Sequence, residues 1–316
     1  MQQPSANTAP TVRQVSVSAD EAGQRIDNFL ARYLKGVPRS RIYRMLRRGE
    51  VRVNSGRIRA RYKVRAGDTI RIPPVRISAA GTLTPGSAVD LEGRIVFENA
   101  RCLIIDKPSG IAVHGGSGLD YGVIEALRAG RPGEPYLELA HRLDRDTSGC
   151  LVIAKRRSFL RAFHEQLRGG MVTKRYLALL AGRWEGGSRT VSVPLRKNHL
   201  RSGERMVIVD DGGKAATTLF RPVSRYATTV LVEVDLKTGR THQIRVHAAH
   251  IGHPLAGDGK YGDPAFNRRM RETGLRRLFL HAHMIEFTDA PAGEPISVSL
   301  PLEAGLQAVI DRLETA

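Results

Sequence analysis

The sequence predicts an α+β protein with two folded parts, a small basic module followed by a larger body on a mixed, mostly antiparallel β-sheet. At roughly 100–200 residues per domain, 316 residues suggest two domains. Residues 25–76 hold 16 Lys and Arg but only three acids, Asp27, Glu50 and Asp68. Many strand-like runs and few helical ones follow. We expect a disordered N-terminus over 1–13, the module over 14–75, a linker over 76–92 and the body over 93–316.

Two helices are expected to open the module. Apolar side chains recur at helical spacing over residues 26–34, and Gly36 and Pro38 then break the helix. Ser40 is expected to cap a second helix that has Ile42, Met45 and Leu46 on one side. The other side aligns three arginines, Arg41, Arg44 and Arg48.

Short strands are expected to close the module. Val51 and Val53 alternate with Arg52, residues 54–56 form a turn, and the last strand covers 69–72. The helices and strands together would present fixed cations to a phosphate backbone. An ordinary solvated helix face is the alternative, which so few acids beside three aligned arginines disfavour.

Seven strands and two helices are predicted in the body. The strands are expected at 95–97, 102–106, 150–154, 176–181, 217–220, 230–236 and 296–300. The helices are expected at 158–168 and 242–251, the second ending at Gly252 and Pro254.

The net charge of +19 implies a polyanionic partner, most often a nucleic acid. An anionic membrane is the weaker alternative, because no basic amphipathic helix carries a face of Trp, Phe and Leu. No run of about 18 apolar residues is present, and the first residues do not resemble a secretion signal. Cys102 and Cys150, each in an apolar run, are expected to be reduced core residues. These features lead us to expect a cytoplasmic protein.

Three polar, Gly-rich stretches beside predicted strands are candidates for the active site, at 106–118, 141–149 and 238–245. The first lacks the spacing of a phosphate-binding loop or a dinucleotide fingerprint, and no Gly-x-Ser-x-Gly motif is present. His247, His250 and His253 have no carboxylate or thiol nearby that would suggest a metal site. No cofactor and no metal are therefore expected.

The second stretch combines two carboxylates, two arginines and a histidine within residues 141–146. An aspartate beside a guanidinium stays ionised, which suits a nucleophile or a base. A surface ion-pair network would use the same residues, and spacing alone favours neither reading.

Several motifs in order resemble the RluA family of pseudouridine synthases. They are KPSG with HGGSG, HRLDRDTSG, the Lys-Arg-Tyr of 174–176, TGRTHQIRVH, and Gly262 after Tyr261. The resemblance covers the whole body, and the basic module is similar to an S4 RNA-binding domain. Asp106 stands where the family usually has Asn, a change that leaves the catalytic assignment untouched.

The resemblance implies a pseudouridine synthase fold and the isomerisation of uridine in RNA, here 23S ribosomal RNA. Asp144 would be the catalytic aspartate, Arg245 its charge partner and Tyr176 the residue that packs on uracil. Arg142 would fill the space left by the flipped base, because a glycosidic bond inside a stack is inaccessible. The remaining expected substrate-binding residues are His141, Lys174, His242, Arg41, Arg44 and Arg48.

Two other functions remain open on the sequence. A non-catalytic ribosome-assembly protein would use the same basic module, although a pure binder does not need an Asp-Arg pair in Gly-rich loops. A synthase of the same family that acts on tRNA is the second, and the S4-like module argues weakly against it. A monomer without a membrane partner is expected.

Overall fold

The structure, a computed structural model, describes residues 12–34, 37, 39–75, 90–115, 122–199, 205–290 and 293–315. It divides into two compact units, Met1–Ala88 and Val89–Ala316, which are treated separately here. Most of the expected disordered N-terminus and of the expected linker lies outside the described residues. Arg13, which we expected in that N-terminus, is the first residue of a strand. No helix in the described segments is long and apolar enough to cross a membrane.

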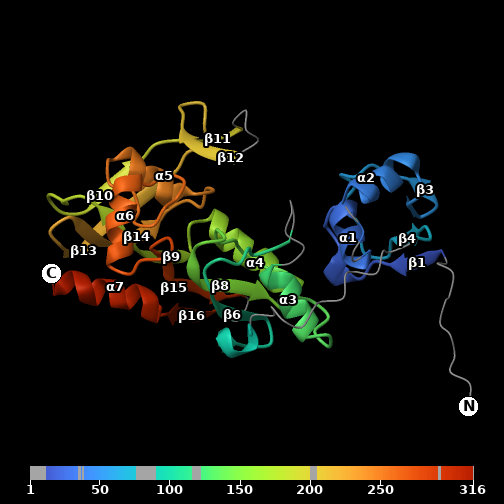
Figure 1. Cartoon of the computed structure of the whole chain (residues 1–316). Coiled ribbons are helices and arrows are strands. Elements are labelled where there is room, and N and C mark those ends of the chain that lie inside the picture. The colour runs from blue at the N-terminus through green and yellow to red at the C-terminus, as the bar shows by residue number, and fades with distance from the viewer. Residues whose placement is uncertain are drawn as a thin grey trace, which may run out of the picture. The chain divides into compact units, whose positions relative to one another are not determined.

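The smaller unit packs two helices on a small antiparallel sheet (Figure 1). Its strands are β1 (Arg13–Ser16), β2 (Arg52–Val53), β3 (Gly56–Arg57) and β4 (Thr69–Ile72), in the order β1-β4-β2-β3. The helices are α1 (Ile26–Tyr33) and α2 (Arg39–Arg48), after the short 3-10 helix η1 (Ala19–Glu21). Phe29, Leu30 and Met45 are fully buried between them, so this unit has a hydrophobic core of its own.

Local chemistry fixes the ends of these elements. Helix α2 ends in a Schellman motif, in which Gly49 has φ +70° and the N–H of Glu50 donates to the carbonyl of Met45. The cap that we predicted at Ser40 is wrong, because the helix already begins at Arg39. Asn54 and Ser55 both have positive φ, as a tight two-residue hairpin turn between β2 and β3 requires.

The predicted arginine face of α2 is present. Ile42, Met45 and Leu46 are buried, whereas Arg44 and Arg48 are exposed. Arg41 is partly exposed. Of the three arginines, Arg41 and Arg48 each lie 3.9 Å from the carboxylate of Glu50, too far for a strong ion pair.

A ten-stranded mixed sheet forms the centre of the larger unit. Its main path runs β10-β13-β14-β9-β15-β8-β6-β5, with β16 on β15 and β7 on β8. The strands are β5 (Ile95–Glu98), β6 (Cys102–Lys107), β7 (Glu138–Leu139), β8 (Ser148–Ala154), β9 (Thr173–Ala181), β10 (Arg189–Ser192), β13 (Thr217–Arg225), β14 (Thr229–Leu236), β15 (Leu280–Asp289) and β16 (Glu294–Ser299). A separate hairpin of β11 (Leu195–His199) and β12 (Arg205–Val209) projects from the unit (Figure 1). Only the β15–β8 pair is parallel among these strands, so the predicted mixed, mostly antiparallel sheet is confirmed.

Alternate side chains of the strands pack against different helices. Leu103 and Ile105 share a core cluster with α3 (Val123–Gly130) and α5 (Gln243–His250). Cys102 and Ile104, one residue out of phase, pack with α4 (Arg157–Arg168). Helices α6 (Pro264–Glu272) and α7 (Ala304–Glu314) cover Leu179 in the same way. The sheet is therefore buried on both faces, and the loops at its strand ends are free to carry chemistry.

Each of the seven predicted strands and both predicted helices of this unit is found. The prediction omitted β7, β10, the β11–β12 hairpin and β15, and the helices α3, α6 and α7. Strand β15 matters most, because it joins two groups of strands. Its parallel contact with β8 comprises only two residue pairs, His281 with Ser148 and Ala282 with Gly149. At Gly149, with φ +105°, an added Cβ would lie 2.3 Å from the carbonyl oxygen of Ala282.

Candidate active site

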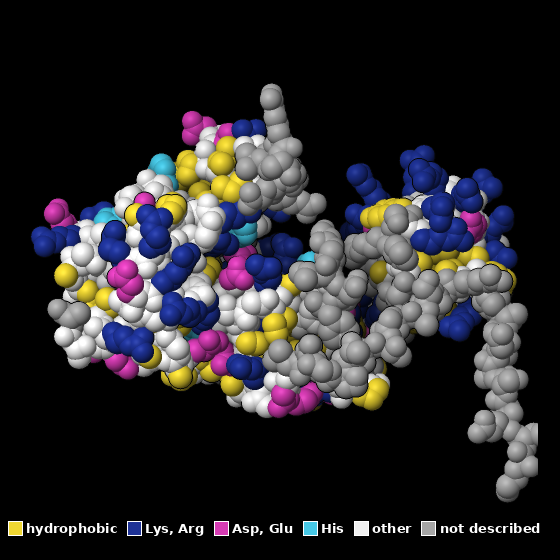
Figure 2. Space-filling model, viewed as in Figure 1, with side chains coloured by type: hydrophobic (Ala, Val, Ile, Leu, Met, Phe, Trp, Pro, Cys, Tyr) yellow, Lys and Arg dark blue, Asp and Glu magenta, His cyan; other side chains and the backbone are white. Residues whose placement is uncertain are grey.

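A cleft of about 810 Å³ opens in the larger unit beside the ends of its central strands. Three of its walls come from segments that the sequence singled out, around Asp144, around Tyr176 and over 238–245. The β11–β12 hairpin contributes Lys197 and Val207 to a further side. Figure 2 shows acidic, basic and histidine side chains gathered in a hollow of this unit. All three predicted catalytic residues line one cleft.

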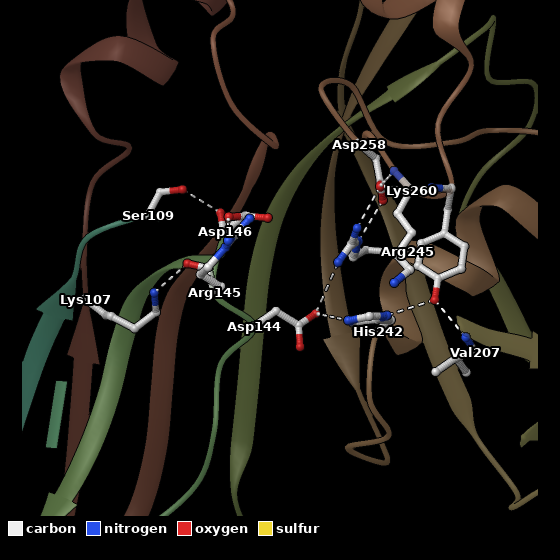
Figure 3. A network of polar contacts seen from close by, with 11 residues as sticks. Lys107, Ser109, Asp144, Arg145, Asp146, Val207, His242, Arg245, Asp258 and Lys260 are labelled. Atoms are coloured by element: carbon white, nitrogen blue, oxygen red, sulfur yellow. Dashed lines mark hydrogen bonds and ion pairs between the residues drawn. The ribbon is translucent and has the colours of Figure 1, made fainter. Parts of the chain in front are cut away.

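The loop that carries Asp144 runs between β7 and β8 and is held by the KPSG segment. The Lys107 ammonium is fully buried and donates to the carbonyl of Arg145 at 3.0 Å (Figure 3). The backbone N–H of Gly110 donates to the same oxygen at 2.9 Å, and the Ser109 hydroxyl donates to the carbonyl of Asp146 at 2.7 Å. These bonds fix the backbone on the C-terminal side of Asp144.

Burial lowers the pKa of Lys107 to about 8. The ammonium also donates to the carbonyls of Pro108 and Ile111, both at 2.8 Å. Three carbonyl partners saturate its three N–H groups, so a buried charge is tolerated without a carboxylate in contact. The motif is therefore a clamp for the loop of Asp144, and its lysine does not face the cleft.

The carboxylate of Asp144 faces two nitrogen atoms from the start of α5. Arg245 Nη1 lies 3.8 Å from Oδ2 of Asp144, and His242 Nε2 lies 3.9 Å from the same oxygen. The Asp144 side chain is 29% exposed, whereas that of Arg245 is only 8% exposed. Asp144 can thus be reached from the cleft while its cationic partner is fixed beneath it.

Arg245 makes its closest ion pair with Asp258 and not with Asp144. Nε and Nη2 of Arg245 each donate to one oxygen of Asp258 at 2.7 Å, a two-bond fork. Burial alone would lower the pKa of Arg245, but the hydrogen bonds to Asp258 outweigh it and raise the pKa. Burial opposes the charge of Asp258 too, and the same pair lowers the pKa of that carboxyl. The pairing of Arg245 with Asp144 implied by the resemblance is thus a longer contact through the one remaining nitrogen, Nη1.

Tyr176 lies on β9, where it belongs to the core cluster and also lines the cleft. It is 7% exposed, and burial together with the charge of Asp144 raises the pKa of its phenol. The hydroxyl is therefore protonated at neutral pH.

The other predicted substrate-binding residues of this unit occupy different parts of the cleft. Arg142 is exposed at the rim, and Lys174 lies two residues before Tyr176 with its pKa lowered by burial. His141 accepts a hydrogen bond from the N–H of Val152 at 3.1 Å, and burial lowers its pKa to about 3. A neutral, bonded His141 holds the start of the loop that carries Asp144. Arg41, Arg44 and Arg48 belong to the other unit.

Sequence reasoning missed Asp258 and gave Tyr261 no role. Tyr261 accepts a hydrogen bond from the N–H of Val207 at 2.9 Å, and its hydroxyl lies 2.8 Å from Nδ1 of His242. The run AGDGKYGD around both residues is as Gly-rich and polar as the three stretches that were singled out. That composition was the available signal. Among the described residues no cluster of three or more His, Cys, Asp or Glu could hold a metal ion.

Comparisons with known proteins identify the family of this chain. A family model described as RNA pseudouridylate synthase matches residues 101–250, and one described as S4 domain matches residues 24–70. The chain is 52% identical to ribosomal large subunit pseudouridine synthase C of Pasteurella multocida, over 96% of this chain and 94% of that protein. It is also 52% identical to the protein of that name in Escherichia coli K12, over 97% and 98%.

A solved structure supports the same fold. The protein described as human RNA pseudouridylate synthase domain containing 4 is 24% identical and gives a TM-score of 0.59, over 72% of this chain and 95% of that one. The expected resemblance is confirmed, and the chain belongs to the RluA-type family of RNA pseudouridine synthases, with an S4 domain near its N-terminus.

Proposed function

We propose that this enzyme isomerises specific uridines of 23S ribosomal RNA to pseudouridine, with Asp144 as the catalytic carboxylate. The observation that carries the proposal is the partly exposed Asp144 in a cleft, held against Arg245 and His242. Close relatives over nearly the full length are named for the ribosomal large subunit, which supports this RNA as substrate.

The reaction is an isomerisation, so substrate and product contain the same atoms and differ in which uracil atom is bonded to the ribose. The bond between N1 of uracil and C1′ of ribose breaks, the base turns, and C5 bonds to C1′. The C5 proton leaves and N1 gains a proton. Asp144 starts the reaction either by attack on C1′ or by removal of a ribose proton, and both roles need an ionised carboxylate. Arg245 Nη1 would favour that state.

Tyr176 would stack on the turning uracil. Because its hydroxyl remains protonated, it can take up the C5 proton only while it passes its own proton on. Arg142, exposed at the rim, is suited to enter the stack that the flipped uridine leaves. Lys174, which also lines the cleft, would contact the RNA backbone or the base.

The S4 unit would provide affinity without chemistry. Arg41, Arg44 and Arg48 on α2 present cations that can neutralise phosphates of the ribosomal RNA. In this proposal the chain acts as a cytoplasmic monomer without a cofactor. The isomerisation is redox-neutral, so it needs no electron donor or acceptor.

Mapping of pseudouridines tests the substrate. The purified protein would be incubated with 23S ribosomal RNA, with large-subunit assembly intermediates and with bulk tRNA, each prepared from cells that lack the enzyme. We expect new pseudouridines at a few positions of the ribosomal RNA and none in tRNA. Modification of tRNA alone would contradict the proposed substrate, and the absence of any product would contradict the proposed activity.

A further inference from the structure

His242 has an unusual position at the start of α5. It adopts the left-handed conformation with φ +53°, which is uncommon for a non-glycine residue. The side chain is 19% exposed and points between Asp144 and Tyr261 (Figure 3). One imidazole nitrogen therefore faces the carboxylate, and the other faces a phenol hydroxyl.

The hydrogen bonds of Tyr261 decide which nitrogen of His242 carries the proton. The Tyr261 oxygen accepts the N–H of Val207 at 2.9 Å, and its own proton is then free for Nδ1 of His242, 2.8 Å away. An Nδ1 that accepts a hydrogen bond leaves the imidazole proton on Nε2. The reverse tautomer would point the lone pair of Nε2 at a negatively charged oxygen.

Two donors then converge on one oxygen of Asp144. His242 Nε2 lies 3.9 Å and Arg245 Nη1 lies 3.8 Å from Oδ2. Both distances exceed that of a hydrogen bond by less than an ångström, and catalytic hydrogen bonds often tighten when substrate binds. Figure 3 shows the other carboxylate oxygen directed away from both residues.

We propose that His242 is a positioning residue, which holds Oδ2 of Asp144 through a neutral Nε2–H and leaves Oδ1 for the ribose. Tyr261 sets the tautomer of His242, and the backbone of Val207 sets the orientation of Tyr261. This chain of contacts connects the proposed catalytic carboxylate to strand β12 of the projecting hairpin. The inference rests on the proposed function of Asp144.

The consequence for kinetics is specific. Removal of one hydrogen bond to a charged group should lower kcat roughly 10- to 100-fold. KM for RNA should remain within about twofold, because most of the affinity comes from phosphate contacts. His242→Ala should show this pattern. His242→Gln should recover much of kcat, because its amide can still donate near the position of Nε2.

A double-variant cycle tests the role of Tyr261. Tyr261→Phe keeps the ring beside Arg245 but removes the hydroxyl, so kcat should fall less than in His242→Ala. If Tyr261 acts only through His242, the double variant should be no slower than His242→Ala alone. In ¹⁵N spectra of the unsubstituted enzyme, the signal of His242 should show the Nε2–H tautomer.

The control is His250→Ala, a histidine exposed at the last turn of the same helix, which should change kcat by less than about twofold. A His242→Ala variant as fast as the unsubstituted enzyme would overturn the positioning role, as would an additive loss in the double variant. Absence of pseudouridine from the unsubstituted enzyme would instead overturn the proposed function. The two failures are therefore distinguishable.

Discussion

At the scale of single residues, the proposed mechanism depends on the charge of one carboxylate, that of Asp144. We predict that Asp144→Asn abolishes pseudouridine formation while RNA affinity is preserved, because the amide keeps the shape but not the charge. Single-turnover assays and filter binding would measure the two effects. Asp146→Asn is the matched control, since this carboxylate is 41% exposed and pairs only with its neighbour Arg145 among the described residues. Substantial product from the Asp144 variant would sink the assignment.

Asp258 is predicted to matter for stability and for turnover through separable effects. Asp258→Asn leaves the buried guanidinium of Arg245 without its charge partner, and breaking a buried pair in this way costs about 3–5 kcal/mol. Turnover should also fall, because Nη1 of Arg245 is no longer fixed toward Asp144. The double variant Asp258→Asn/Arg245→Gln carries no unpaired charge, so it should regain stability but not activity. Thermal unfolding and turnover of both variants would show whether this separation exists.

His141 predicts a pH dependence of stability. Burial lowers its pKa in the folded state to about 3, below an ordinary value near 6.5, so the unfolded chain binds the extra proton first. The contribution of neutral His141 to the free energy of unfolding is therefore fully present above pH 6.5, and it is lost as the pH falls from there toward 3. His141→Gln can still accept the N–H of Val152 but cannot be protonated. Urea unfolding at pH 7.5 and 5.5 should therefore show that the free energy of unfolding falls less between these pH values for the variant than for the unsubstituted enzyme.

At the scale of elements, helix α2 separates its two tasks onto two faces. Its buried face, Ile42, Met45 and Leu46, belongs to the core, and its arginine face is available to RNA. We predict that replacement of Arg41, Arg44 and Arg48 by alanine weakens ribosomal RNA binding and reduces its salt dependence, with little change in the melting temperature. The lysine triple variant keeps the charge and should keep most of the salt slope. RNA affinity would be measured over a range of salt concentrations. An alanine variant with unchanged affinity and unchanged salt dependence would contradict the prediction.

The elements that the sequence did not predict share a physical cause. Strand β15, LHAHMIEFTD, lacks clean alternation because its apolar side chains pack into two different core clusters and because it carries two histidines near its start. Helix α6 has four charged residues among nine, so its apolar period is short. Predicted strands such as 150–154 and 230–236 were found because buried, β-branched runs have few alternative structures.

The site was predictable only in part for a similar reason. Residues 144, 176 and 245 were placed together by resemblance to a family, because sequence spacing does not reveal which loops meet in space. Asp258 looks like an ordinary turn residue until Arg245 is found 2.7 Å from it. Lys107 belonged to a noted motif, yet only its three carbonyl partners show that it holds a loop.

At the scale of the whole molecule, each unit has its own core, so the two should be separable. Deletion of residues 1–75 removes the core of the smaller unit completely and none of the cleft residues. We predict that the remainder folds, binds ribosomal RNA less tightly with a flatter salt dependence, and retains most of its turnover at saturating RNA. Calorimetry, binding at several salt concentrations and saturating turnover would test the three parts. An unchanged affinity would place substrate recognition wholly in the larger unit.

The short parallel contact between β8 and β15 has a mechanical meaning for this enzyme. Asp144 belongs to the strands on one side of that contact, whereas Arg245 and His242 belong to a helix that packs on the other side. Two residue pairs join these groups of strands, and the two backbones approach closely there because Gly149 has no side chain. The methyl group of a Gly149→Ala variant would clash with the backbone of Ala282. It would force β8 and β15 apart and lengthen the distances from Asp144 to Arg245 and His242, although Gly149 itself does not line the cleft.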